Sequence, residues 1–588
     1  MASFDAPLEA YQHHLRARHA QFVREHLDEL IARSQVDPHQ NQATVQEIQR
    51  TQAAFERMQS RVRLWKGVTT LLTVLFWVGL TLCGIGILLK LIEHPTPNLT
   101  SLIIGAGFVA TMTFLLKQFW LKEKVHALES QCEELKARHH TLLKTAWEQL
   151  HPLNLLFTWD TVTDLLRKTL PEIHFDKSFS HQQFLDLIAG HHWNGQLTDE
   201  LSVCNLQTGH INGNPFALVK GRSMRMSERV YSGTRTVSVR KSHYVNGKRQ
   251  SYTSFETLYA EITRPCPEYY MTSFLLFGSD AAPHLTFSRS PSQHSGKEDT
   301  FFNRLAKNRT TKKLEAFSRN LDDEYGFTMM ANREFETLFH AIDRSDEREF
   351  RLLFTPYAQQ QMVKLLNDTT IGYGDNFHMI KDSFTTLLFP EHLTETDQSL
   401  NPVDFWHYDI VEIKRRFINF NADYFKALYF ALAPLMTIPL YCQKCSRAER
   451  AAATPKFETS SWESELIANA YGEKHFRHPK SATNALLKTK TTRHGDATVF
   501  DVTAHSFSAK ERTEYVPQWD SNGHRHNVPV EWIEYTPIKR TQKVIVLPDA
   551  TLRPGGPSSN ADAIALLRDN GYAVKHCLHI RSTYVALI

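Results

Sequence analysis

Two cysteines and two histidines in the C-terminal third form the pattern closest to a metal site. Cys442-x-x-Cys445 precedes His475-x-x-His478, and two thiolates with two imidazoles would satisfy tetrahedral zinc. The spacing of the histidine pair departs from the common form, so the four residues also fit two reduced thiols and two surface histidines. A metal-dependent enzyme that uses these Cys and His residues is therefore one hypothesis for the function.

A second cluster is basic. Residues 220–249 include nine basic residues and one acidic residue, Glu228, whereas the net charge of the whole 588-residue chain is +4. Such a segment could bind anionic lipid headgroups or an acidic partner, or it could be a solvated hairpin neutralised by other segments. Aromatic residues interleave poorly with the charges, which argues against nucleic acid. The nine residues are Lys220, Arg222, Arg225, Arg229, Arg235, Arg240, Lys241, Lys248 and Arg249.

The usual enzyme motifs do not occur in the sequence. HExxH, GxSxG, GxxxxGK[ST] and GxGxxG are all missing. Apolar residues make up 42% of the chain and charged residues 22%, which excludes a disordered or fibrous protein. Seven cysteines are too few for a secreted disulfide scaffold of this length. These features favour a non-enzymatic scaffold, adaptor or sensor.

Two apolar runs predict where in the cell the candidate metal and basic residues lie. Gly67–Leu89 has 23 uncharged residues and Leu99–Leu116 has 18, and about 20 helical residues cross a bilayer. The short loop between the runs predicts a transmembrane helical hairpin rather than a buried helical pair. Basic residues flank the outer ends of both runs, so both termini are expected to be cytoplasmic at a bacterial inner (plasma) membrane.

Amphipathic helices are predicted on both sides of this hairpin. The 3,4 spacing of apolar residues is typical of a coiled-coil seam. The two seams could pair with each other as an antiparallel stalk, or they could join copies of the chain in a homo-oligomer. The seam residues are Ile48, Thr51, Phe55, Met58, Val62 and Trp65 before the hairpin, and Leu121, Val125, Leu128, Cys132, Leu135, His139, Leu142 and Ala146 after it.

The remaining chain has an α+β pattern with clustered strands. Asn246-Gly247 and Asp520-Ser521-Asn522-Gly523 each indicate a β-hairpin turn. The second turn is followed by His524 and His526, which could also ligate a metal. Phe350–Phe354 is expected to be a strand, and Thr355-Pro356 to begin a helix.

The apolar stretch at residues 427–442 contains Pro434 and Pro439. It is short for a bilayer and interrupted by proline, which favours a core helix over a third span. The predicted order is cytoplasmic helices (1–66), a transmembrane hairpin (67–120), a stalk helix (121–150), an α+β domain (151–400), a helical connector (401–455) and a C-terminal α+β unit (456–588).

One long stretch resembles a known family. FETLFHAIDRSDEREFRLLFTPYAQQQMVKLL (335–366) is similar to a signature of bacterial two-pass membrane proteins that carry a domain of unknown function. FSHQQFLDLIAGHHWNG (179–195) and GHINGNPFALV (209–219) resemble the entry segment of the same family. Members are often encoded beside LemA-family proteins, so the resemblance implies a LemA-like protein partner. It implies no catalytic residues, and this chain departs from shorter members by its stalk helices and C-terminal extension.

Overall fold

The chain folds into two compact units. The computed structural model describes residues 6–92, 97–115, 120–190, 200–245, 248–296, 309–316, 318, 327–443, 458–493, 497–553 and 555–588. One unit, which we call the helical unit, comprises Glu25–Phe157 and Phe405–Phe417. The other, the body, comprises the chain up to Arg24, Thr158–Asp404 and Ile418–Ile588.

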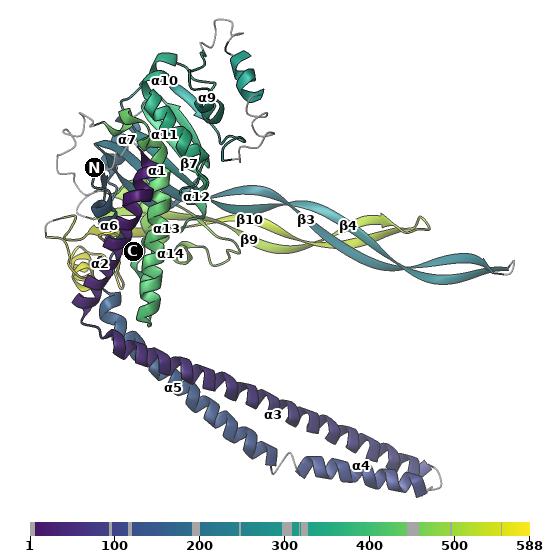
Figure 1. Ribbon diagram of the computed structural model, residues 1–588. Coiled ribbons are helices and arrows are strands. Elements are labelled where there is room, and N and C mark those ends of the chain that lie inside the picture. The colour runs from purple at the N-terminus through teal and green to yellow at the C-terminus, as the bar shows by residue number, and fades with distance from the viewer. Residues whose placement is uncertain are drawn as a thin grey trace. The chain divides into compact units, whose positions relative to one another are not determined.

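Three long helices make up most of the helical unit. Helix α3 (Pro38–Ile92) packs along both α4 (Pro97–Leu115) and α5 (Lys122–Asn154) (Figure 1). Ion pairs join α3 to α5, with Arg138 Nη2 at 2.5 Å from Glu47 and Lys66 Nζ at 2.8 Å from Glu129. Every residue of the two predicted seams is buried or half-buried. The seams therefore pair within one chain, as one of the two alternatives predicted.

The apolar part of α3 lies outside any core. Among the described helices, α3 alone is long and apolar enough to be a candidate membrane span, and only 6% of its most apolar window is buried. The second predicted run forms α4, a 19-residue helix packed beside α3. The predicted pair of helices is thus present, but the structure does not establish that both helices span a membrane.

The body contains two antiparallel sheets. The first has seven strands in the order β1-β2-β3-β4-β7-β6-β5, and the second has five in the order β11-β12-β10-β9-β8. The strands of the first sheet are β1 (Ile173–Phe175), β2 (Ser202–Ile211), β3 (Asn214–Val245), β4 (Lys248–Gly278), β5 (Thr286–Arg289), β6 (Phe377–Asp382) and β7 (Thr385–Pro390). Those of the second are β8 (Leu486–Arg493), β9 (Thr498–Trp519), β10 (Arg525–Pro548), β11 (Leu578–Ile580) and β12 (Thr583–Leu587). The α+β class is therefore correct.

Two hairpins extend far beyond their sheets as ribbons (Figure 1). Strands β3 and β4 pair without interruption from Phe216↔Phe277 to Val245↔Lys248, and β9 pairs β10 from Arg525↔Trp519 to Val546↔Thr498. Both hairpins were predicted from their turns, although Asn246-Gly247 lies outside the described residues. The ribbons pack on each other through a small apolar cluster that includes Val237, Leu258 and Val530. Gly233 permits this approach, since a Cβ there would lie 2.1 Å from the carbonyl oxygen of Pro529.

Helix α14 (Ser461–Phe476) holds the two sheets together. Trp462 and Leu466 belong to the core of the first sheet, whereas Ile467 and Phe476 belong to that of the second. Other helices of the body include α1 (Pro7–Ala10), α6 (Thr161–Thr169), α7 (His181–Gly190), α9 (Arg333–Phe339), α10 (Glu347–Leu353), α11 (Pro356–Asn367), α12 (Glu391–Glu395) and α15 (Asn560–Asp569). Helices α2 (Arg16–Ser34) and α13 (Ile410–Met436) begin or end in it.

Three local predictions can now be judged. Phe350–Phe354 is not a strand, because Asp346 caps α10 by accepting from the Glu349 N–H at 2.9 Å, and helical spacing brings the Phe350 and Phe354 rings to 4.7 Å. Thr355 caps α11 as predicted. Of the predicted core helix at residues 427–442, residues 427–436 form the buried end of α13, where Leu428 and Leu432 are fully buried, and the helix ends at Met436, before Pro439.

Candidate functional site

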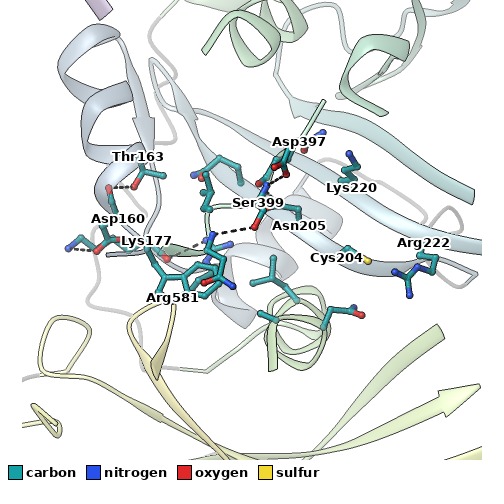
Figure 2. Close-up of a pocket in the computed structure, with 18 of the residues that line it drawn as sticks. Asp160, Thr163, Lys177, Cys204, Asn205, Lys220, Arg222, Asp397, Ser399 and Arg581 are labelled. Carbon is teal, nitrogen blue, oxygen red and sulfur yellow. Dashed lines mark hydrogen bonds and ion pairs between the residues drawn. The ribbon is translucent and has the colours of Figure 1, made fainter. Parts of the chain in front are cut away.

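A polar cavity opens between the first sheet and α14. Its volume is about 370 Å³, and β2, β3, α6, α14 and residues 397–401 contribute to its lining. Figure 2 shows Asp160, Lys177 and Arg581 at one side and Cys204, Lys220 and Arg222 at the other. Segments from distant parts of the chain, between Trp159 and Arg581, therefore meet around one space.

Three of the four cations in the lining are held by carboxylates. Arg222 forms an ion pair with Glu473 of α14, and Lys177 Nζ lies 3.2 Å from Asp160. The buried Arg581 guanidinium donates to the Leu206 carbonyl at 2.5 Å and lies 3.4 Å from Glu463. These pairs neutralise the charges on the cavity wall and fix the cations in place.

Lys220 is different. Its Nζ donates to the main-chain carbonyls of Thr396 at 2.7 Å and Leu393 at 3.5 Å, and the charge that acts on it most is the Asp397 carboxylate. Partial burial lowers the pKa of this lysine, because desolvation disfavours its ammonium form. An ammonium with one donor left in a half-buried cavity is suited to an anionic group of a small polar ligand.

Cys204 is the only thiol among the described lining residues, and it is poorly suited to nucleophilic chemistry. Burial raises the pKa of the Cys204 thiol, and its Sγ contacts the Ser202 carbonyl at 3.5 Å. The neutral thiol is a weak nucleophile at neutral pH. The arrangement is thus suited to binding a polar ligand more than to covalent catalysis.

The nine predicted basic residues are divided between two places. Lys220 and Arg222 line the cavity, and the other seven lie on the β3–β4 ribbon. On the ribbon, Arg225 pairs with Glu268 at 3.3 Å, and Arg235 donates to the Asn527 carbonyl at 2.7 Å. Glu268 of β4 therefore neutralises one charge of the segment, and lipid or acidic-partner binding by the segment stays a prediction.

The predicted zinc ligands are not assembled among the described residues. Cys445 lies outside them. Cys442 Sγ lies 3.9 Å from the Met436 carbonyl, the His475 ring packs against Tyr471, and His478 Nδ1 accepts from the Lys480 N–H at 3.1 Å. The described part of the chain contains no group of three or more His, Cys, Asp or Glu side chains that could hold a metal. Zinc binding by the four residues stays a prediction.

The second histidine pair has a local partner. His524 Nδ1 and His526 Nε2 lie 3.4 Å and 3.0 Å from Asp520 Oδ2 in the β9–β10 turn. Hydrogen bonding from His526 lowers the pKa of the Asp520 carboxyl to about 2. This contact explains the pair as a turn-stabilising device.

Sequence reasoning missed most of the cavity. Cys204, Asp397 and Arg581 carry no local motif, and they are far apart in the chain. Arg581 has one conformational signature, a positive φ of 46° that a non-glycine residue adopts only under strong structural constraint. Backbone strain of this kind has no recognisable sequence pattern here.

Comparisons with protein-family models, with curated proteins and with solved structures give no match for this chain. The resemblance to two-pass membrane proteins and the LemA-like partner that it implies therefore stay predictions.

Proposed function

We propose that this chain is a membrane-anchored binding protein: α3 and α4 cross the bacterial inner membrane, and the body acts in the cytosol as a scaffold, adaptor or sensor. The observation that carries the proposal is the bare apolar surface of α3. Leu71, Trp77 and Leu88 are 62%, 58% and 60% exposed in a segment without charges. Such a surface is costly in water and favourable in hydrocarbon.

The base of the helical pair supports the same proposal. Trp65 of α3 and Trp120 meet with ring centroids 5.9 Å apart. Lys124 Nζ lies 4.1 Å and 4.6 Å from the centroids of these two rings. Tryptophan and lysine prefer the headgroup region, and basic residues mark the cytoplasmic side.

The body supports a binding role. Its cavity presents an ammonium, Lys220, beside three other cations that are already paired, and its thiol is held in the neutral form. A ligand in this cavity would contact both β2 and α14, which belong to different layers of the body. If the protein is a sensor, ligand binding in this cavity would be the event that it detects.

Alkaline extraction of cell membranes tests the anchor. The full chain should stay in the membrane pellet and need detergent for release, because two apolar helices resist extraction. The double variant Leu75→Arg with Val78→Arg should move most of the chain to the supernatant, since each central arginine costs about 3 kcal/mol. The matched control, Gln59→Arg with Ser60→Arg, adds the same charge to exposed positions before the apolar segment and should remain in the pellet.

Protease added outside intact cells tests the orientation. The body should be protected until the cells are opened. Full-length chain that is freely soluble without detergent, or a body that external protease digests, would overturn the proposal.

A further inference from the structure

Within the part of the body that the structure describes, the end of the β3–β4 ribbon has no packing partner of its own. The β9–β10 turn reaches β3–β4 at two points: Asn522 Nδ2 donates to the Arg240 carbonyl at 3.1 Å, and the Ser521 N–H donates to Glu256 at 3.2 Å. Before these contacts, Val239 and Leu258 are buried against the second ribbon. Beyond them, residues 248–253 are exposed at every position. We call residues 240–245 and 248–255 the tip.

A bare two-stranded ribbon is marginally stable in water, because neither of its faces is covered. The tip still pairs in register, with Lys241 opposite Tyr252 and Arg240 opposite Thr253. Extending a ribbon past its supporting layer brings no core burial. It does present side chains to a binding partner outside the body.

The composition of the tip indicates the chemistry of this partner. Residues 240–255 contain Arg240, Lys241, Lys248 and Arg249 and no acidic residue. Among the side chains whose burial is described there, the aromatic residues Phe255 and Tyr252 are 76% and 48% exposed.

Strand register distributes these groups over both faces of the tip. Residues directly opposite each other share a face, so Lys241, Tyr252 and Lys248 lie on one face. Arg240, Arg249 and Phe255 lie on the other. Each face therefore has two of the four cations and one of these two exposed aromatic rings.

We infer that the tip is a second membrane contact, which inserts Phe255 and Tyr252 into the interface of an acidic bilayer and places its four cations among lipid phosphates. A lipid interface surrounds an inserted element, so it can satisfy both faces of the tip at once. A folded protein surface would cover one face and leave the other bare. Cations near an anionic leaflet and aromatic rings at headgroup depth are both favourable. The choice of a bilayer as partner rests in part on the proposed anchor.

The test uses the full chain reconstituted into nanodiscs of neutral phosphatidylcholine. Separate vesicles that contain phosphatidylglycerol are added, and bound chain is measured by flotation at low and high salt. The chain should bind these vesicles, release them at high salt, and ignore vesicles of phosphatidylcholine alone.

Two variants locate the contact. Changing Arg240, Lys241, Lys248 and Arg249 to Gln should weaken vesicle binding at least about tenfold, since each cation contributes separately. The double variant Tyr252→Ser with Phe255→Ser should weaken vesicle binding about threefold, and the binding that remains should depend on salt as in the wild type. The control changes Arg225, Arg229, Lys510 and Arg512 to Gln, which removes the same charge from the ribbons outside the tip, and should bind as the wild type does.

Several results would overturn the inference: binding that is insensitive to salt, equal losses in the tip and control variants, or salt-dependent binding of duplex DNA or an acidic peptide without binding of vesicles. Failure of the anchor is seen separately, because the chain would then leave the nanodiscs before any vesicle is added.

Discussion

Two apolar helical segments of this chain have opposite environments. Residues 67–89 of α3 expose most of their apolar side chains, whereas residues 424–436 of α13 are packed among helices, strands and the N-terminal segment of the body. Tyr429 illustrates the difference, since its hydroxyl donates to the Pro7 carbonyl at 2.9 Å and its ring packs against Tyr11 and Phe430. Helical segments of similar apolar composition are thus buried in a core in one region and exposed on the surface in the other.

This difference shows that the length of an apolar segment and the residues that flank it distinguish a candidate membrane span from a core helix better than hydropathy does. The α3 segment has 23 uncharged residues with basic residues before it, long enough to cross a bilayer. The apolar segment of α13 follows Lys426, contains Pro434 and ends at Met436, so it is too short to cross a bilayer. Its polar neighbours are also satisfied internally, as His392 shows by contacting the Ala427 carbonyl at 2.9 Å.

The largest expected effect comes from placing the same charge in both segments. Leu432→Asp should destabilise the body by about 4 kcal/mol or more, because it buries an unpaired carboxylate at a position that is 0% exposed. Urea unfolding in mild detergent measures this loss.

Leu82→Asp is the partner experiment on α3. It should change the free energy of unfolding of the body by no more than about 0.5 kcal/mol, while it reduces retention in membranes. Equal destabilisation by the two variants would remove the distinction between the segments.

A smaller effect is expected from acid. Burial lowers the pKa of His392 and of His19 to about 4, and both side chains contact α13 residues or their main chain. Below the ordinary pKa of 6.5 the unfolded chain binds protons that the folded chain does not, so stability falls as the pH drops from about 6.5 to 4. Each histidine should reduce the free energy of unfolding by about 2 kcal/mol at pH 5 relative to pH 7.

Urea unfolding at pH 7 and pH 5 checks this expectation. His392→Gln should reduce the difference between the two pH values, and the control His13→Gln, on an exposed side chain, should leave it unchanged. A body equally stable at both pH values would show that these histidines are not held in the neutral form.

The smallest expected effect comes from one hydroxyl. Tyr429→Phe should cost about 1 kcal/mol, because the Pro7 carbonyl loses its donor in a buried site. Trp77→Phe on α3 should leave the unfolding of the body unchanged, since Trp77 is exposed. A cost of the same size for both substitutions would contradict the comparison.

Local sequence signals predicted much of the fold. Asp520-Ser521-Asn522-Gly523 marked the β9–β10 turn, where Gly523 adopts a φ of 81° and Asp520 accepts from the Asn522 and His524 N–H groups. Thr355 and Pro356 marked the beginning of α11. Phe350–Phe354 misled because a short apolar run fits both a strand and one turn of helix, and the cap at Asp346 favoured the helix.

Residue order alone establishes where turns and caps occur, which stretches are apolar, and how far apart the charges lie, since these depend on neighbours within a few positions. It does not assign Lys220 to a cavity and Arg249 to a bare ribbon, although both belong to one basic segment. Three-dimensional packing makes that assignment, because contacts between residues hundreds of positions apart determine which side chains lose water and which keep it.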